Sequence, residues 1–166
     1  MTRRNLTIKW LLYTLATLLL VAVQCLVLNH ITLWGIHPFL LPLIAALAAM
    51  WEGGKGILFS VIFGLLTDLT TVGPIPCFYT LAFLAVAVTA MLIARHLIVP
   101  GFLCAFLVSV LSIVLCGLLQ ILFLSYRAGI SLLPALLLMA KELISTACMP
   151  LVYFPYRWVH TRIDAY

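Results

Sequence analysis

The chain has 166 residues, of which 66% are hydrophobic and only 8% are charged, and its formal net charge is +5. Soluble domains carry roughly 25% charged residues, so this composition excludes a water-soluble protein and leaves no stretch polar enough for a soluble domain. The basic residues stand singly between apolar runs, which argues against a nucleic-acid partner and is typical of the cytoplasmic loops of a membrane protein.

Because a bilayer-spanning helix needs about 20 mostly apolar residues, the sequence predicts a compact all-α bundle of about six transmembrane helices. Residues 1–166 then form a single polytopic membrane domain. A first helix is expected to be retained, since its apolar run is longer than the core of an ordinary signal peptide. The first five expected spans cover residues 10–29, 33–50, 54–72, 76–94 and 99–125.

Prolines and charges complicate two of these spans. Pro38 and Pro76 are expected in the first turns of the second and fourth spans, while Pro42 either kinks the second span or marks its true start. The last segment, 129–156, is too long for one perpendicular span. Either one tilted helix begins near Pro134, or a short interfacial helix precedes the span.

Six spans place both termini on one side of the membrane. That side would hold all but two of the nine basic residues, namely Arg3, Arg4, Lys9, Lys55, Arg95, Arg157 and Arg162, while Arg127 lies in an opposite loop. The positive-inside rule makes the shared side cytoplasmic. Trp10, Trp51 and Trp158 fall at the same interface, as expected for an aromatic belt. We therefore expect an N-in, C-in topology.

Small residues recur every four positions in the third expected span, at Gly56, Ser60 and Gly64. On a helix they form one stripe, and such stripes let membrane helices approach closely. Asp68 continues the stripe near the outer end of the span. Three roles compete for it: a cap on the following loop or on the N-terminus of the fourth span, an ion pair with Lys141 or Arg127, or a substrate or proton site. We favour the two structural roles.

Other polar residues give weaker signals. Lys141 and Glu142 are adjacent and point about 100° apart on a helix, so they pair poorly with each other. If their segment spans the membrane, one of them needs a partner on another helix, and Lys141 with Asp68 is the pairing to test. Alternatively, both lie at the outer interface. Gln24 and Gln120 are expected to make interhelical hydrogen bonds.

Catalytic and metal-binding motifs are missing from the sequence. The five cysteines form no CxxC pair, and His30 and His37 lack a third ligand nearby. Asp68 has no second intramembrane aspartate, and no serine lies in a GxSxG motif. We therefore expect a protein without catalytic residues or a cofactor.

The stretch HPFLLPLIAALAAMWEGGKGILFSVIFGLLTDLTTVGPIPCFYTLAFLAVAV resembles the family of the bacterial rod-shape-determining protein MreD. The family pattern is a proline opening the second span, a glycine-spaced third span ending in Gly-Leu-x-x-Asp, and a glycine before the fourth. Those positions are Pro38, Gly56, Gly64, Leu65, Asp68 and Gly73. The basic tail PLVYFPYRWVHTRID is also similar. Ser60 stands where the family often has glycine, and the charges of Lys141 and Glu142 depart from a usually more neutral segment.

The resemblance implies an inner-membrane scaffold of the bacterial cell-elongation machinery. Its partners would be the bitopic protein MreC, the actin-like MreB, and the synthase pair formed by RodA and a penicillin-binding protein. It would help to place lateral peptidoglycan synthesis, and it has no catalytic residues to transfer.

Two other functions stay open. A substrate-binding subunit of a vitamin-type energy-coupling factor transporter has a similar size and glycine-spaced helices, and Ala45 and Ala49 could then form a docking face. Such a subunit needs several polar groups that converge on a pocket, and the outer loops NHITLWGIHP and TTVGPIP offer few. The third alternative is a packing subunit of an unrelated membrane complex.

Overall fold

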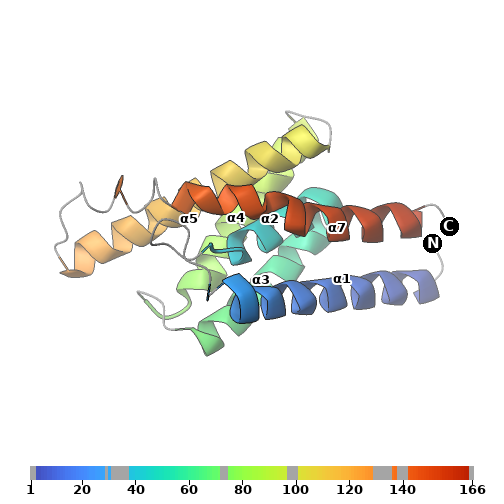
Figure 1. Ribbon diagram of the computed structural model, residues 1–166, viewed down its shortest axis with the longest axis horizontal. Coiled ribbons are helices and arrows are strands. Elements are labelled where there is room, and N and C mark those ends of the chain that lie inside the picture. Colours follow the sequence, from blue (N-terminus) through green and yellow to red (C-terminus); the bar gives the residue numbers. More distant parts are fainter. Residues whose placement is uncertain are drawn as a thin grey trace.

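The computed structural model describes residues 3–28, 30, 38–71, 75–96, 101–128, 136–137 and 142–164, and within these ranges every regular element is helical (Figure 1). Helix α1, Arg3–Val23, continues as a short π-helix, Gln24–Leu28. The remaining long elements are α2 (Leu41–Glu52), α3 (Gly54–Thr70), α4 (Phe78–His96), α5 (Phe102–Ala128) and α7 (Met149–Asp164), the last preceded by a 3₁₀ helix, Leu143–Cys148.

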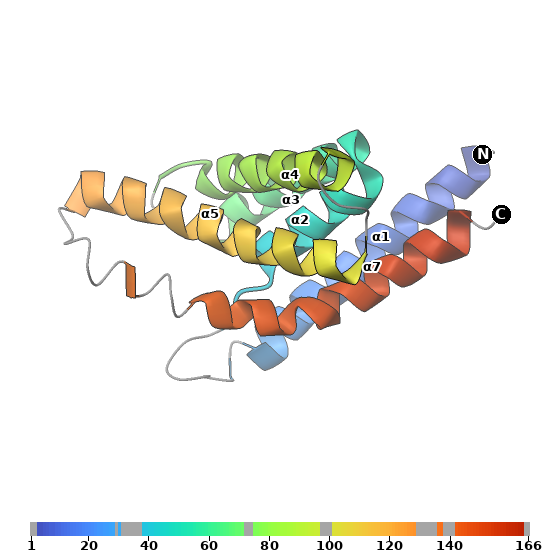
Figure 2. The same ribbon diagram turned by 90° about the horizontal axis from the view of Figure 1, so that it is seen from above.

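Helix α2 forms the centre of the bundle. Every residue from Leu41 to Met50 is buried, and α2 packs against α3, α4, α5 and α7. Helix α1 packs mainly on α7, and the two run antiparallel so that the N- and C-termini lie at the same end of the molecule (Figures 1 and 2). An even number of spans would produce such a common end, and the number of spans stays a prediction.

The surface of the bundle is apolar and its interior contains polar side chains. Large aliphatic residues such as Leu26, Leu69 and Leu103 are 70–76% exposed, whereas Thr17, Gln24, Ser60, Thr67, Ser109, Ser112 and Ser145 are buried. Among the described residues, three helical stretches are long and apolar enough to cross a membrane: Thr7–Leu28, Phe78–His96 and Phe102–Phe123. Apolar surfaces are stable in lipid and polar interiors bind helices to one another, so the chain is a helical membrane protein, as the composition predicted.

Helix α2 is shorter than its expected span. Its 12 residues extend about 18 Å at 1.5 Å per residue, which is less than the roughly 30 Å of a hydrocarbon core. Pro42 lies at the start of the helix, so of the two interpretations of this proline the true start is correct. Residues 38–40 are not helical, and Pro38 therefore does not lie in the first turn as expected.

Side chains from distant segments explain why the backbone before α2 is not helical. The Gln24 side-chain amide donates a hydrogen bond to the Pro38 carbonyl at 2.8 Å, and its oxygen accepts one from the Leu40 N–H at 3.0 Å. The Ser145 hydroxyl accepts from the Phe39 N–H at 3.0 Å. Because buried backbone groups must be paired, these contacts replace the helical hydrogen bonds that the segment gives up. Gln24 thus bonds to a distant segment, but its partners are the non-helical backbone before α2 and not another helix.

The remaining boundaries differ by a few residues. Pro76 lies in a turn two residues before α4, not in its first turn. The last helix extends to Asp164, so it ends later than the expected segment 129–156, and its described part includes a 3₁₀ helix from Leu143 to Cys148. Residues 129–135 and 138–141 lie outside the described ranges, and they include most of the stretch in which the tilted helix and the interfacial helix would differ.

Candidate functional site

The small residues of α3 form the contact surface between three helices. A Cβ atom added to Gly56 would lie 2.7 Å from the Ala49 Cα of α2. At Gly64 it would lie 2.8 Å from the Thr80 Cα and 2.9 Å from the Tyr79 carbonyl oxygen of α4. Real side chains do not reach such distances from backbone atoms, so only glycine allows these helices to pack this closely. The stripe therefore packs against α2 at one end and α4 at the other.

Ser60 lies between the two glycines and is fully buried. Its hydroxyl donates to the Ala45 carbonyl of α2 at 2.9 Å and to the Gly56 carbonyl of its own helix at 2.8 Å. Ala45 and Ala49 of α2 are themselves buried. The hydroxyl thus adds a polar contact to the close packing, which explains why serine is compatible with this position.

Asp68 caps helix α4 from the end of helix α3. Its Oδ1 accepts a hydrogen bond from the Tyr79 N–H at 2.9 Å, and its Oδ2 accepts from the Thr80 N–H at 2.8 Å and the Thr80 hydroxyl at 2.6 Å. These N–H groups belong to the first turn of α4, where no helical carbonyl is available. An anion there is also favoured by the helix dipole. The first of the three expected roles for Asp68, a cap on the fourth span, therefore matches the geometry.

The glycine stripe and the cap act on the same residues of α4. Gly64 contacts the backbone of Tyr79 and Thr80, and Asp68, one turn further along α3, bonds to the N–H groups of the same two residues. The close approach that Gly64 permits is therefore what brings the carboxylate within hydrogen-bonding distance. We refer to Gly56, Ser60, Gly64 and Asp68, with their contacts on α2 and α4, as the α3 joint.

The structure says less about the three other polar or glycine residues singled out in the sequence, Gly73, Lys141 and Glu142. Gly73 and Lys141 lie outside the described residues, so the proposed pairing of Lys141 with Asp68 stays a prediction. Glu142 is half-buried and borders a small cavity of about 20 Å³, together with Phe39, Pro42, Ile113, Cys116, Gln120 and Ser145. A cavity of that size has room for about one water molecule. Glu142 and Gln120 therefore border the same small cavity.

A second polar cluster, centred on Glu52, was not found by sequence reasoning. Oε1 of Glu52 lies 2.8 Å from Lys9 Nζ and 3.2 Å from His160 Nδ1, and it accepts a hydrogen bond from the Tyr13 hydroxyl at 3.1 Å. The Lys9 and Glu52 side chains are only 6% and 9% exposed. The cluster joins α1, the end of α2 and α7. We call Lys9, Tyr13, Glu52 and His160 the Glu52 cluster.

The charge of Glu52 is stabilised by its neighbours. Glu52 follows the apolar run of α2, beyond residue 50 where the second span was expected to end. Burial by itself would raise the pKa of this carboxyl, but the hydrogen bonds from His160, Lys9 and Tyr13 and the positive charge of Lys9 outweigh burial and hold the pKa below its ordinary value. The carboxylate and the ammonium group thus form a buried, hydrogen-bonded ion pair.

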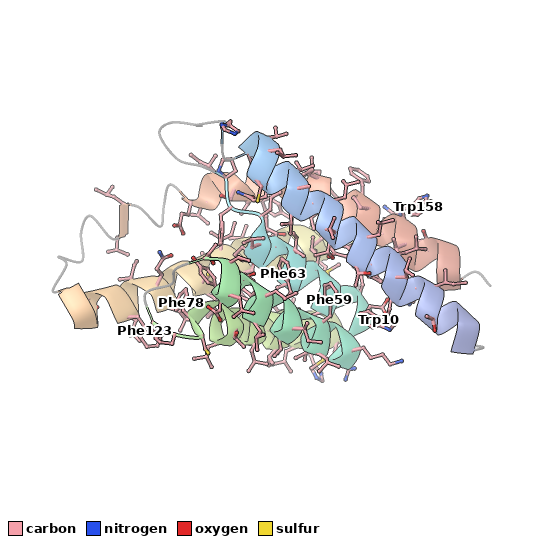
Figure 3. All side chains as sticks on the ribbon, turned by 90° about the horizontal axis from the view of Figure 1, so that it is seen from below. Trp10, Phe59, Phe63, Phe78, Phe123 and Trp158 are labelled. Carbon is pink, nitrogen blue, oxygen red and sulfur yellow. The ribbon has the colours of Figure 1, made fainter. Side chains whose placement is uncertain are left out.

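Aromatic side chains extend the Glu52 cluster along α1 and α7. Tyr13 stacks on Tyr156 with ring centroids 5.1 Å apart, and the Tyr156 hydroxyl lies 2.7 Å from the Thr17 hydroxyl. Trp10 contacts both Tyr13 and Phe59 of α3, and it lies at the same end of the molecule as Trp158 (Figure 3). The sequence held one indication of the Glu52 cluster. The expected N-in, C-in topology would place Lys9, Glu52 and His160 at the same membrane interface.

No protein-family model, curated protein or solved structure matches this chain.

Proposed function

We propose that this protein is a non-enzymatic scaffold of the bacterial cell-elongation machinery, located in the cytoplasmic membrane as a multi-pass protein with both termini in the cytoplasm. Its partners are then a bitopic MreC-like protein, the RodA and penicillin-binding-protein synthase pair, and the MreB-like cytoskeleton. Through these contacts it helps to place lateral peptidoglycan synthesis and to maintain cell shape. The proposal rests on the resemblance of the chain to the MreD family.

The observation that supports it most is that three of the residues carrying the resemblance, Gly56, Gly64 and Asp68, belong to one structural unit. Gly56 and Gly64 set the packing distances of α3 against α2 and α4, and Asp68 caps α4. Leu65, the other residue of the Gly-Leu-x-x-Asp motif, is 51% exposed on the outside of α3. A motif whose members build a rigid three-helix unit and leave one apolar side chain at the lipid-facing surface suits a protein that presents helix faces to membrane partners.

The contacts of the same residues argue against the transporter alternative. Docking on an energising module would use small residues such as Ala45 and Ala49, yet both are buried against Ser60 and Gly56 of α3. A substrate ligand needs free polar atoms, yet both carboxylate oxygens of Asp68 accept hydrogen bonds from α4. The two alanines and the Asp68 carboxylate are thus already used in contacts between the helices of the bundle.

A depletion experiment tests the proposal. The gene is placed under a repressible promoter in its native cells, and cell width and length are followed by microscopy as the protein is depleted. The scaffold function predicts that rod-shaped cells widen and become round while vitamin uptake is unchanged. Cells that keep their shape but lose uptake of one vitamin would instead identify a transporter subunit.

A matched pair of variants refines this experiment. Gly64→Leu is expected to force α3 and α4 apart and to fail to restore cell shape. Gly54→Ala is expected to restore it, since a Cβ at Gly54 would meet no atom within 4 Å. If both variants restore rod shape at normal abundance, close packing at the α3 joint is not needed for the proposed function.

A further inference from the structure

Three exposed basic side chains surround the turn between α2 and α3. Lys55 lies in the first turn of α3, and the Arg95 guanidinium of α4 reaches to 3.0 Å from the position that a Cβ of Gly53 would occupy. The Arg157 guanidinium of α7 lies 5.8 Å above the Tyr153 ring, which in turn contacts Trp51 at 6.2 Å. We call Lys55, Arg95 and Arg157 the basic end.

The acid nearest to the basic end does not neutralise it. Glu52 belongs to the same turn, but its carboxylate points into the bundle and is paired with Lys9 and His160. Within the ranges that the structure describes, no ion pair involves Lys55, Arg95 or Arg157. Among the described residues, three exposed cations from three helices therefore have no ion-pair partner, and each would attract an external anion.

Each of these cations has an exposed apolar neighbour three residues away along its helix, on the side away from the end of the bundle that holds the chain termini. Lys55 is followed by Leu58, which is 64% exposed; Arg95 is preceded by Leu92 at 46%; and Arg157 is preceded by Phe154 at 60%. Residues three apart on a helix lie on the same side of it. The surface thus repeats one arrangement three times, with a positive charge toward the end of the bundle and an apolar side chain toward its middle.

That arrangement matches an amphiphile with a negatively charged head. We propose that the basic end binds the phosphate headgroups of anionic phospholipids of the phosphatidylglycerol type, while Leu58, Leu92 and Phe154 contact their acyl chains. An acidic segment of a soluble protein would match the cations but not the exposed apolar residues beside them. Each basic residue near a membrane surface contributes about a fivefold preference for anionic lipid, so three of them give a preference of roughly a hundredfold.

Lipid retention by the purified full-length protein tests the proposal. The protein is prepared in mild detergent and mixed with phosphatidylglycerol or phosphatidylcholine of identical acyl chains, and bound lipids are counted by native mass spectrometry. The wild type is expected to retain phosphatidylglycerol preferentially. The triple variant Lys55→Gln, Arg95→Gln, Arg157→Gln is expected to lose most of that preference. Arg127→Gln, which removes a cation from the far end of α5, is expected to keep it.

Equal retention of the two lipids by the wild type would overturn the proposal, as would an undiminished preference in the triple variant. Displacement of phosphatidylglycerol by a soluble poly-glutamate peptide that binds more tightly would assign the surface to an acidic protein segment instead. If the triple variant does not fold, a salt titration of the wild type decides. The preference must fall steeply between roughly 50 and 500 mM salt, because exposed charges are screened there; a salt-independent preference would contradict the proposal.

Discussion

Replacing Asp68 by alanine should destabilise the bundle strongly, because the carboxylate satisfies three donors at once. The substitution leaves the N–H groups of Tyr79 and Thr80 and the Thr80 hydroxyl without their acceptor. Loss of an N-terminal cap costs about 1 kcal/mol, and hydrogen bonds to charged groups contribute about 1.5–3 kcal/mol each. Since the site is only half-buried and water can replace part of this bonding, we expect Asp68→Ala to lower the free energy of unfolding by about 2–4 kcal/mol.

Two further variants separate the carboxylate's contributions. Asp68→Asn keeps one acceptor oxygen but places an NH₂ group against a backbone donor, so it should show about half of the alanine effect. Thr80→Val removes only the hydroxyl donor and should lower stability by about 1 kcal/mol. The assay is reversible unfolding in mixed detergent micelles, monitored by tryptophan fluorescence. If Asp68→Ala unfolds at the same denaturant fraction as the wild type, the carboxylate does not hold α4 to α3 and this reasoning is wrong.

Three other substitutions or conditions follow from the described contacts. Gly64→Ala should lower the free energy of unfolding by about 1–3 kcal/mol, since overpacking forces the backbones of α3 and α4 apart. Gly54→Ala should unfold like the wild type, because a Cβ there meets nothing within 4 Å. Equal effects of the two substitutions would show that Gly64 is not needed for close packing. Lys9→Met alone should cost about 3–5 kcal/mol, because it leaves the buried Glu52 carboxylate uncompensated. The double variant Lys9→Met, Glu52→Leu should regain most of that stability, and a purely additive double-mutant cycle would refute the ion pair. Because the pKa of Glu52 is lowered in the folded protein, its ionisation stabilises the fold fully above the pKa of an unfolded glutamate, about 4.3. This contribution is lost as the pH falls through the folded-state pKa. Thermal unfolding measured between roughly pH 6 and 3.5 should show the loss in the wild type but not in Glu52→Gln.

The features that could be predicted from the sequence are those set by local pattern. Apolar runs of sufficient length gave α1, α4 and α5 to within a few residues, except that α1 begins at Arg3, before the apolar run. The four-residue spacing of Gly56, Ser60 and Gly64 identified the packing side of α3, because the helical repeat alone places these residues on one stripe. Capping was one of the two structural roles favoured for Asp68, because this residue lies near the end of α3, just before another helix begins.

The features that could not be predicted depend on contacts between distant residues. The second span was expected to begin at residue 33, whereas α2 begins at Leu41. The reason is that Gln24, in the π-helix after α1, and Ser145 bind the backbone of residues 38–40 in place of helical hydrogen bonds. The Glu52 cluster brings together residues from both ends of the chain, and no local pattern marks them as neighbours. The sequence attached no role to Glu52, although its burial and its ion pair make it a central contact between α1, α2 and α7.

The most direct test of the proposed scaffold is to identify what the protein binds in its native membrane. The tagged protein is purified from its own cells in mild detergent, and the co-purifying proteins are identified by mass spectrometry. The Asp68→Ala variant at matched abundance serves as the comparison. The account predicts recovery of a bitopic coiled-coil protein together with wall synthases, and weaker recovery with the variant. Recovery of paired ATPases with a membrane coupling subunit would contradict it and would identify a transporter subunit.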